Sequence, residues 1–184
     1  LTDLQGILVA NDITLKISQI TGANGNIQVA MAGARNFKAD IEGSVKGDKL
    51  DISYSNHATL NTVENIKVSG DLGAGYDIYS LNTANTTNTV RTIDLSGLKN
   101  VEKGTIALDN SNTNLLSLKA TSGDDKVTLI DNMLIGNVAN NVDIDLGAGD
   151  DEIITKDLVA NKTVTINGGA GNDLFDVRGS KTDV

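Results

Sequence analysis

The sequence predicts an all-β fold, a right-handed parallel β-solenoid of about seven coils with glycine-rich turns along one edge. Three observations lead to this prediction. Short glycine-rich turns recur along the 184-residue chain. The segments beside these turns alternate apolar and polar residues, which is typical of half-buried strands. No segment keeps a helical pattern over three turns. A single coil cannot bury its apolar side chains, so the coils must stack to form a core.

The clearest turn is Gly168–Asp176, near the C-terminal end of the sequence. It fits the pattern Gly-Gly-x-Gly-x-Asp-x-(large apolar)-x at every fixed position, with Asp173 at the sixth. Glycine accepts φ > 0, so the backbone can aim several carbonyls inward, and Asp173 adds a carboxylate where they converge. Such a set of hard oxygens suits Ca²⁺, and this pattern is that of calcium-binding parallel β-helix repeats. A single match is also compatible with a plain glycine-rich turn, so recurrence decides between the two interpretations.

The pattern recurs in partial form. Three further turns share glycine at the fourth position, aspartate at the sixth and an apolar or aromatic residue at the eighth: Leu72–Tyr79, Ala120–Val127 and Leu146–Ile153. Weaker copies place Asn26, Asp48 and Asn100 at the sixth position. The mean separation of these sixth positions is roughly 24 residues, enough for two strands and a tight turn in each coil.

Strands are predicted on both sides of the turns, where apolar residues alternate with polar ones and β-branched residues are frequent. The expected strands comprise residues 65–68, 92–95, 142–145 and 164–166 before the turns, and 78–81, 126–130 and 152–155 after them. A β-sandwich is the main alternative, because short strands at regular spacing suit it too. The period and the turn chemistry favour the solenoid.

Composition and charge narrow the possible functions. The net charge is −9, and residues 121–184 carry 12 acidic and 5 basic side chains, against 12 and 10 in residues 1–120. The chain has no basic stripe and only two Phe and three Tyr, so nucleic acid is not an expected partner. Cysteine is absent, which excludes disulfides and thiolate metal sites. No apolar run is long enough to span a membrane. We expect residues 1–184 to form one domain cut from a longer protein, with weaker coils in residues 1–119 and calcium-rich coils in residues 120–184.

The turns that end at Asp77, Asp125, Asp151 and Asp173 resemble those of the repeats-in-toxin (RTX) family. Members of that family are exported by type I secretion and fold outside the cell into calcium-loaded β-rolls. The threonine-, asparagine- and alanine-rich background is most similar to the RTX-bearing surface-layer (S-layer) proteins of Gram-negative bacteria. The chain departs from the shortest family form of 18 residues per coil, because its coils are longer and carry one glycine-rich turn each.

The resemblance implies a set of calcium ligands. In the family, an ion lies between turns of successive coils and is bound by turn carbonyls and the sixth-position aspartate. Asp125, Asp151 and Asp173 would supply carboxylates, and Asp77 is a plausible fourth ligand. Asp124 and Asp150, at the fifth position, are equally expected to be solvated or to bind. Backbone ligands would come from Gly123, Gly147, Gly149, Gly169 and Gly171.

The sequence contains no complete residue pattern of a known catalytic site. His57 is the only histidine, so no zinc site with a second His or Cys can form. A Ser-His-Asp triad through His57 has no Gly-x-Ser-x-Gly elbow to support it. A polysaccharide lyase built on a β-helix would need charged residues at one coil position. The three arginines, Arg35, Arg91 and Arg178, do not recur at one such position. We therefore do not expect an enzyme.

The function expected is that of a calcium-dependent structural module in a secreted, extracellular cell-surface protein, part of an S-layer or a large adhesin. Its partners would be further copies in a surface lattice, an adhesion partner, or cell-surface polysaccharide bound through regions outside this chain. The alternative is the C-terminal RTX carrier domain of a secreted protease or lipase. An HExxH helix or a Gly-x-Ser-x-Gly elbow in flanking sequence would favour that alternative.

Overall fold

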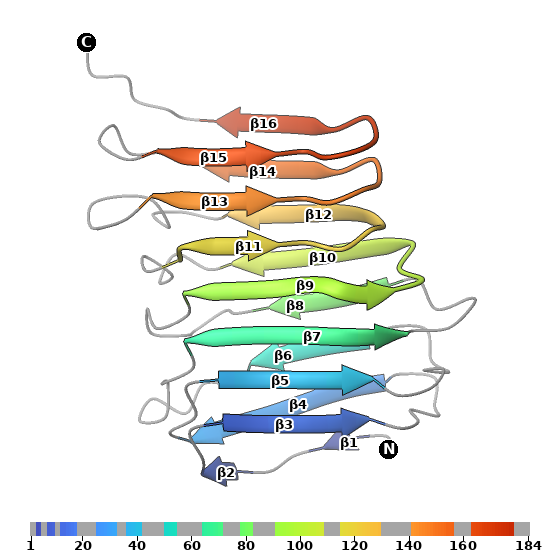
Figure 1. Cartoon of the computed structure of the whole chain (residues 1–184), viewed down its shortest axis with the longest axis vertical. Coiled ribbons are helices and arrows are strands. Elements are labelled where there is room, and N and C mark those ends of the chain that lie inside the picture. Colours follow the sequence, from blue (N-terminus) through green and yellow to red (C-terminus); the bar gives the residue numbers. More distant parts are fainter. Residues whose placement is uncertain are drawn as a thin grey trace.

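The regular structure of the described part of the chain consists of strands (Figure 1). The computed structural model describes residues 3–4, 7–9, 12–17, 25–32, 36–41, 50–54, 64–71, 78–82, 91–108, 115–129, 141–156 and 163–178. These residues contain no helix, and thus no helix that is long and apolar enough to cross a membrane. The all-β prediction is confirmed for this part of the chain.

The described residues form sixteen strands. They are β1 (Asp3–Leu4), β2 (Ile7–Val9), β3 (Asp12–Ile17), β4 (Gly25–Ala32), β5 (Asn36–Ile41), β6 (Leu50–Tyr54), β7 (Asn65–Asp71), β8 (Ile78–Asn82), β9 (Thr92–Lys99), β10 (Lys103–Leu108), β11 (Ser117–Lys119), β12 (Asp124–Leu129), β13 (Val142–Asp145), β14 (Glu152–Lys156), β15 (Val164–Asn167) and β16 (Leu174–Arg178). All seven strands expected from sequence alternation are present, within a few residues of their expected bounds.

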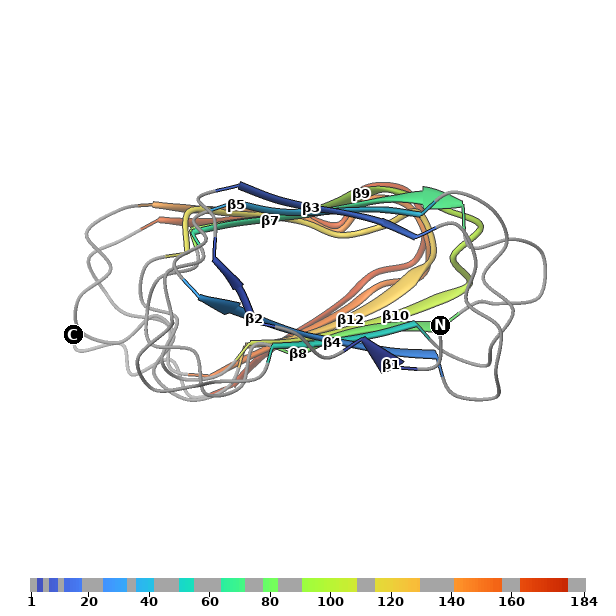
Figure 2. The same cartoon turned by 90° about the horizontal axis from the view of Figure 1, so that it is seen from below.

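Two parallel sheets face each other, and the chain passes between them with every strand from β3 onward (Figures 1 and 2). The odd-numbered strands form a seven-stranded sheet in the order β15-β13-β11-β9-β7-β5-β3. The even-numbered strands, with β1, form a nine-stranded sheet in which β2 also pairs with β4. All of these pairs are parallel; Ile153, for example, lies opposite Val127 and Phe175. This topology is consistent with a β-solenoid-like arrangement.

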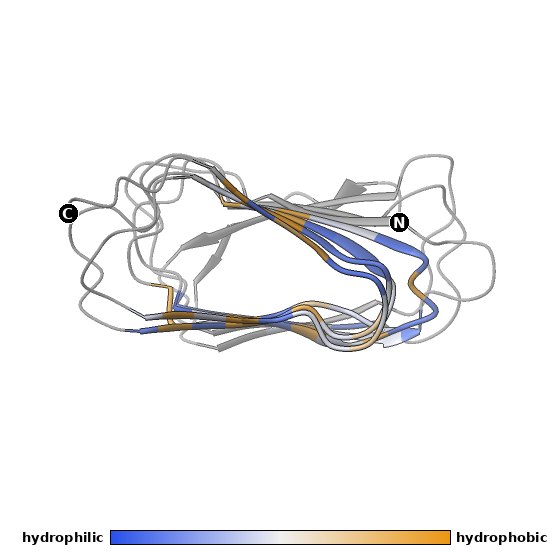
Figure 3. Cartoon of the chain, turned by 90° about the horizontal axis from the view of Figure 1, so that it is seen from above, coloured by the Kyte–Doolittle hydropathy of each residue, from blue (hydrophilic) through white to orange (hydrophobic). Residues whose placement is uncertain are grey.

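The core lies between the two sheets and consists of aliphatic columns. On the seven-stranded sheet Ile93 lies opposite Ile66 and Leu118, and Leu118 lies opposite Ile144. All of these side chains are at most 3% exposed. Full burial of one such side chain contributes roughly 1.5–3 kcal/mol, so the stacked columns are the main source of stability. Figure 3 shows apolar segments superposed in successive strands of both sheets.

The last strand of the stack is only partly covered. Within the described residues β16 pairs with β14 alone, so one of its edges has no neighbouring strand. Leu174, Phe175 and Val177 are 57%, 44% and 47% exposed. Phe175 continues the column of Ile106, Val127 and Ile153, and among the described residues no further strand lies beyond it.

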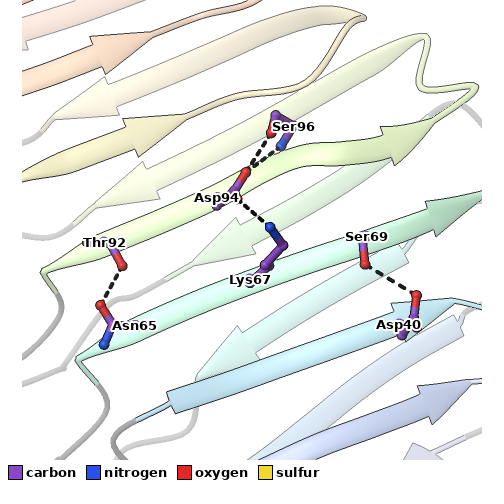
Figure 4. A network of polar contacts seen from close by, with 7 residues as sticks. All are labelled: Asp40, Asn65, Lys67, Ser69, Thr92, Asp94 and Ser96. Carbon is purple, nitrogen blue, oxygen red and sulfur yellow. Dashed lines mark hydrogen bonds and ion pairs between the residues drawn. The ribbon is translucent and has the colours of Figure 1, made fainter.

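The outer face of the seven-stranded sheet carries polar contacts between neighbouring strands (Figure 4). Lys67 on β7 donates to Asp94 on β9 at 2.9 Å, and Asp94 also accepts from the hydroxyl of Ser96 at 2.6 Å. Burial alone would raise the pKa of Asp94, but the hydrogen bonds from Lys67 and Ser96 outweigh it and lower that pKa. Thr92 and Asn65 form a further cross-strand hydrogen bond at 2.5 Å. These contacts fix the register on a solvated face.

The repeat register predicted for the earlier coils is wrong where the structure describes it. Gly104, not Asn100, lies opposite Asp125 in the preceding coil. Strand β9 continues to Lys99 and its pairing with β7 contains a bulge, so this coil needs extra residues before its next strand begins. Asn26 pairs with Asp51 in β6. Through Ser80 and Thr105 this position is in register with Lys126, one residue beyond Asp125.

Candidate metal site

Three glycine-rich turns lie above one another on one edge of the two sheets, at the right of Figure 1. They connect β11 to β12 (residues 120–123), β13 to β14 (residues 146–151) and β15 to β16 (residues 168–173). Backbone hydrogen bonds join the second and third turns: Ala170 N–H donates to the carbonyl of Gly147 at 3.1 Å, and Gly149 N–H donates to the carbonyl of Ala170 at 2.8 Å. Asp150 N–H of the second turn donates to Oδ1 of Asp124, beside the first turn, at 2.9 Å. The structure thus places the predicted turns of residues 120–127, 146–153 and 168–176 in contact.

Glycine is required in these turns for two reasons, which Gly149 illustrates. Its φ of +129° lies in a region that residues with a side chain rarely adopt. A Cβ on Gly149 would also lie 2.6 Å from both the carbonyl carbon and the carbonyl oxygen of Gly123 in the preceding coil. Gly171, with φ of +138°, packs in the same way against the carbonyl oxygen of Gly149. The turn carbonyls therefore point along the stack, towards the next coil.

The three sixth-position aspartates form a ladder. Asp125 N–H donates to Oδ1 of Asp151 at 2.7 Å, and Asp151 N–H donates to Oδ1 of Asp173 at 3.2 Å. Asp125 and Asp151 are each 1% exposed, while Asp173 is half-buried. Each coil thus binds the carboxylate of the next coil, which fixes the turn register along this edge.

The fifth-position residues form a second ladder that runs in the opposite sense. Asp150 N–H donates to Oδ1 of Asp124 at 2.9 Å, and Asn172 N–H donates to Oδ1 of Asp150 at 2.8 Å. These side chains are exposed. Sequence reasoning gave Asp124 and Asp150 as solvated or ligating, and did not foresee that their carboxylates join the turns through backbone amides.

One buried oxygen of the inner ladder lacks a hydrogen-bond partner. Oδ2 of Asp151 is buried and accepts no hydrogen bond. Burial raises the pKa of Asp151 to about 6; the hydrogen bond from Asp125 N–H lowers it, and the negative charges of Asp125, Asp173 and Asp124 raise it. A buried carboxylate oxygen without a partner is costly unless it is protonated or paired with a cation.

The lysine next to Asp125 in the sequence does not supply that cation. Lys126, which follows Asp125 in the sequence, points to the outer face and pairs with Glu152 at 2.7 Å. The Lys126 side chain is about half exposed. A strand directs consecutive side chains to opposite faces, so the lysine next to Asp125 is held away from the inner aspartates.

The stacked turns that contain Asp151 offer hard oxygen atoms as possible metal ligands. Carbonyl oxygens of Thr121, Gly123, Gly147 and Gly149 lie against glycine Cα atoms of the following coil. In the described part of the chain no three His, Cys, Asp or Glu side chains gather closely enough to hold a metal ion by themselves. A metal ion at this edge would therefore take most of its ligands from the backbone, which fits the oxygen preference of Ca²⁺. The unpartnered oxygen of Asp151 and the carbonyls of the stacked turns are of the type that such an ion needs.

The other residues that the sequence singles out fall into two groups. Gly123, Gly147, Gly149, Gly169 and Gly171 all belong to the three stacked turns, as predicted. Asp77, Asp48 and His57 lie outside the described residues.

A scan against protein-family models finds no match, and searches of curated proteins and of solved structures find no similar protein.

Proposed function

We propose that the chain is a calcium-dependent structural module of a secreted bacterial cell-surface protein, part of an S-layer or a large adhesin. The fold we infer is a right-handed β-solenoid of about seven coils, roughly 24 residues each. The observation that carries the proposal is the buried, unpartnered Oδ2 of Asp151, which lies in a stack of turns whose carbonyls point along the coil axis. The RTX-like turn sequences support the same interpretation.

Calcium is the ion that this edge suits best. Ca²⁺ accepts six to eight oxygen ligands in flexible geometry, including backbone carbonyls, at about 2.3–2.6 Å. Mg²⁺ requires near-ideal octahedral geometry and retains its waters, which carbonyls fixed in tight turns do not accommodate. The candidate carboxylate ligands are Asp151 and Asp173, with carbonyls of the turns before and between them.

The ion would act by stabilising the folded state. Without it, the inner aspartates repel one another and Asp151 is charged in a buried position, which disfavours stacking of the last coils. An ion that binds only the folded chain stabilises it by mass action, about 2.7 kcal/mol at a hundredfold excess over its Kd. Low calcium in the cytosol would keep the chain loose for export, and millimolar calcium outside the cell would complete folding. Outside the cell, the module would associate with further copies in a lattice or with an adhesion partner.

The test is a comparison of ions on the purified chain. Circular dichroism and thermal unfolding are recorded with a chelator, with excess calcium and with excess magnesium at equal ionic strength. We expect calcium to increase β-structure and raise Tm, and magnesium to have little effect. Equal stabilisation by both ions, or none by either, would contradict the calcium assignment.

A further inference from the structure

Thr121 occupies the position that glycine occupies in the next two turns. The carbonyl oxygen of Thr121 lies against Gly147, and that of Gly147 lies against Gly169. Each of these residues precedes an aspartate of the inner ladder by four positions: Asp125, Asp151 and Asp173, respectively. Thr121 is therefore the one member of this column of turn residues that carries a side chain.

The side chain of Thr121 meets the carboxylate of its own turn. Its hydroxyl donates to Oδ2 of Asp125 at 2.8 Å, and its backbone N–H donates to the same oxygen at 2.6 Å. The hydroxyl oxygen also accepts from Gly123 N–H at 3.2 Å. Thr121 and Asp125 are 3% and 1% exposed, so these bonds are shielded from water.

The two neighbouring aspartates thus differ at equivalent atoms. Oδ2 of Asp125 receives two hydrogen bonds from Thr121, whereas Oδ2 of Asp151 receives none. Gly147, which replaces Thr121 in that coil, has no hydroxyl to donate. On the other side of Asp125, the residue opposite it in the preceding coil is Gly104, so no further carboxylate continues the ladder there.

We propose that Thr121 is a specificity-determining residue that closes the N-terminal end of the cation column. Its hydroxyl and amide satisfy the carboxylate oxygen of Asp125 that an ion would otherwise bind. The coil of Asp125 then needs no ion of its own, and Asp151 is the first aspartate of the column that requires one. This inference rests on the calcium-binding function proposed above.

Three substitutions of Thr121 in the full chain test this assignment. Thr121→Gly removes the hydroxyl and leaves space, as at Gly147. Thr121→Ser keeps the hydroxyl, and Thr121→Val keeps the volume without a donor. Calcium stoichiometry is measured by isothermal titration calorimetry, and Tm is measured with a chelator and with excess calcium.

We expect Thr121→Ser to match the unaltered chain in stoichiometry and calcium response. Thr121→Gly should bind one additional calcium ion per chain, with a lower Tm in chelator that calcium largely restores. Thr121→Val should have a lower Tm that calcium does not restore, because the methyl group fills the space. Unchanged stoichiometry in Thr121→Gly, or a loss of folding that calcium does not reverse, would overturn the role of Thr121 while leaving the calcium function intact. Absence of calcium binding by the unaltered chain would overturn both.

Discussion

Asp151→Asn should stabilise the domain when calcium is absent and remove most of the stabilisation that calcium gives. Asparagine keeps the size of the side chain and its Oδ1 can still accept from Asp125 N–H. The pKa of Asp151 rises from 3.8 to about 6 on folding, mainly through burial. Since one pKa unit corresponds to about 1.4 kcal/mol, the charged carboxylate costs the folded state about 3 kcal/mol at neutral pH. The new amide group needs an acceptor of its own and costs about 1–3 kcal/mol without one, so we expect a net gain of about 0–2 kcal/mol.

The same pKa shift determines the pH dependence. Between about pH 4 and pH 6 the folded state binds more protons at Asp151 than the unfolded state does, because its folded pKa is the higher one. Stability from this group therefore falls as the pH rises through that window and stays lower above it. Calcium should remove this fall, because the ion pairs with the charged form. Asp151→Asn should remove it in the absence of calcium as well.

Urea unfolding in chelator and in excess calcium, at pH 5 and pH 7, measures these differences. The matched control is Asp143→Asn, which removes the same charge from an exposed position on β13. It should stay within about 0.5 kcal/mol of the unaltered chain and keep its calcium response. If Asp151→Asn is destabilised in chelator and responds to calcium as Asp143→Asn does, Asp151 is a turn-forming residue and the metal assignment of this edge fails.

Three further outcomes are expected from thermal or urea unfolding. Gly149→Ala should lower the free energy of unfolding by about 1–3 kcal/mol or more, because a φ of +129° is strained for alanine and the new Cβ would meet Gly123. An unchanged Tm would contradict the turn geometry. Leu118→Ala, at a position 0% exposed in the aliphatic column, should cost about 2–5 kcal/mol, and a loss below 1 kcal/mol would contradict the core assignment. Lys67→Met should cost less than about 1 kcal/mol because its pair with Asp94 is largely solvated. That small contribution should disappear in high salt and as the pH falls through the lowered pKa of Asp94; a larger, salt-independent loss would be inconsistent with a surface ion pair.

The strands and the last three turns could be predicted from sequence because their signals are local. Alternation of apolar and polar residues marks a half-buried strand without knowledge of its neighbours. The glycines of the turns are required by φ and by close approach, so their spacing alone indicates which aspartates stack. Asp125, Asp151 and Asp173 are therefore aligned in the structure as the spacing predicts.

The errors arose where pairing between strands decides the outcome. The long β9 and its bulge against β7 shift the register, so that Gly104 takes the place expected for Asn100. No periodicity in the sequence reports a bulge, because it depends on the partner strand. The role of Thr121 was also missed, although a signal was present: threonine stands at a position where the next two turns have glycine.

Diffraction from crystals grown in calcium, with anomalous data recorded for that element, tests the central claim most directly. We predict an anomalous peak about 2.3–2.6 Å from Oδ2 of Asp151, with backbone carbonyls of the adjoining turns among its ligands. We predict no peak at Oδ2 of Asp125, which Thr121 already satisfies. A turn edge without any peak, and with Oδ2 of Asp151 paired to a protein group, would contradict the account.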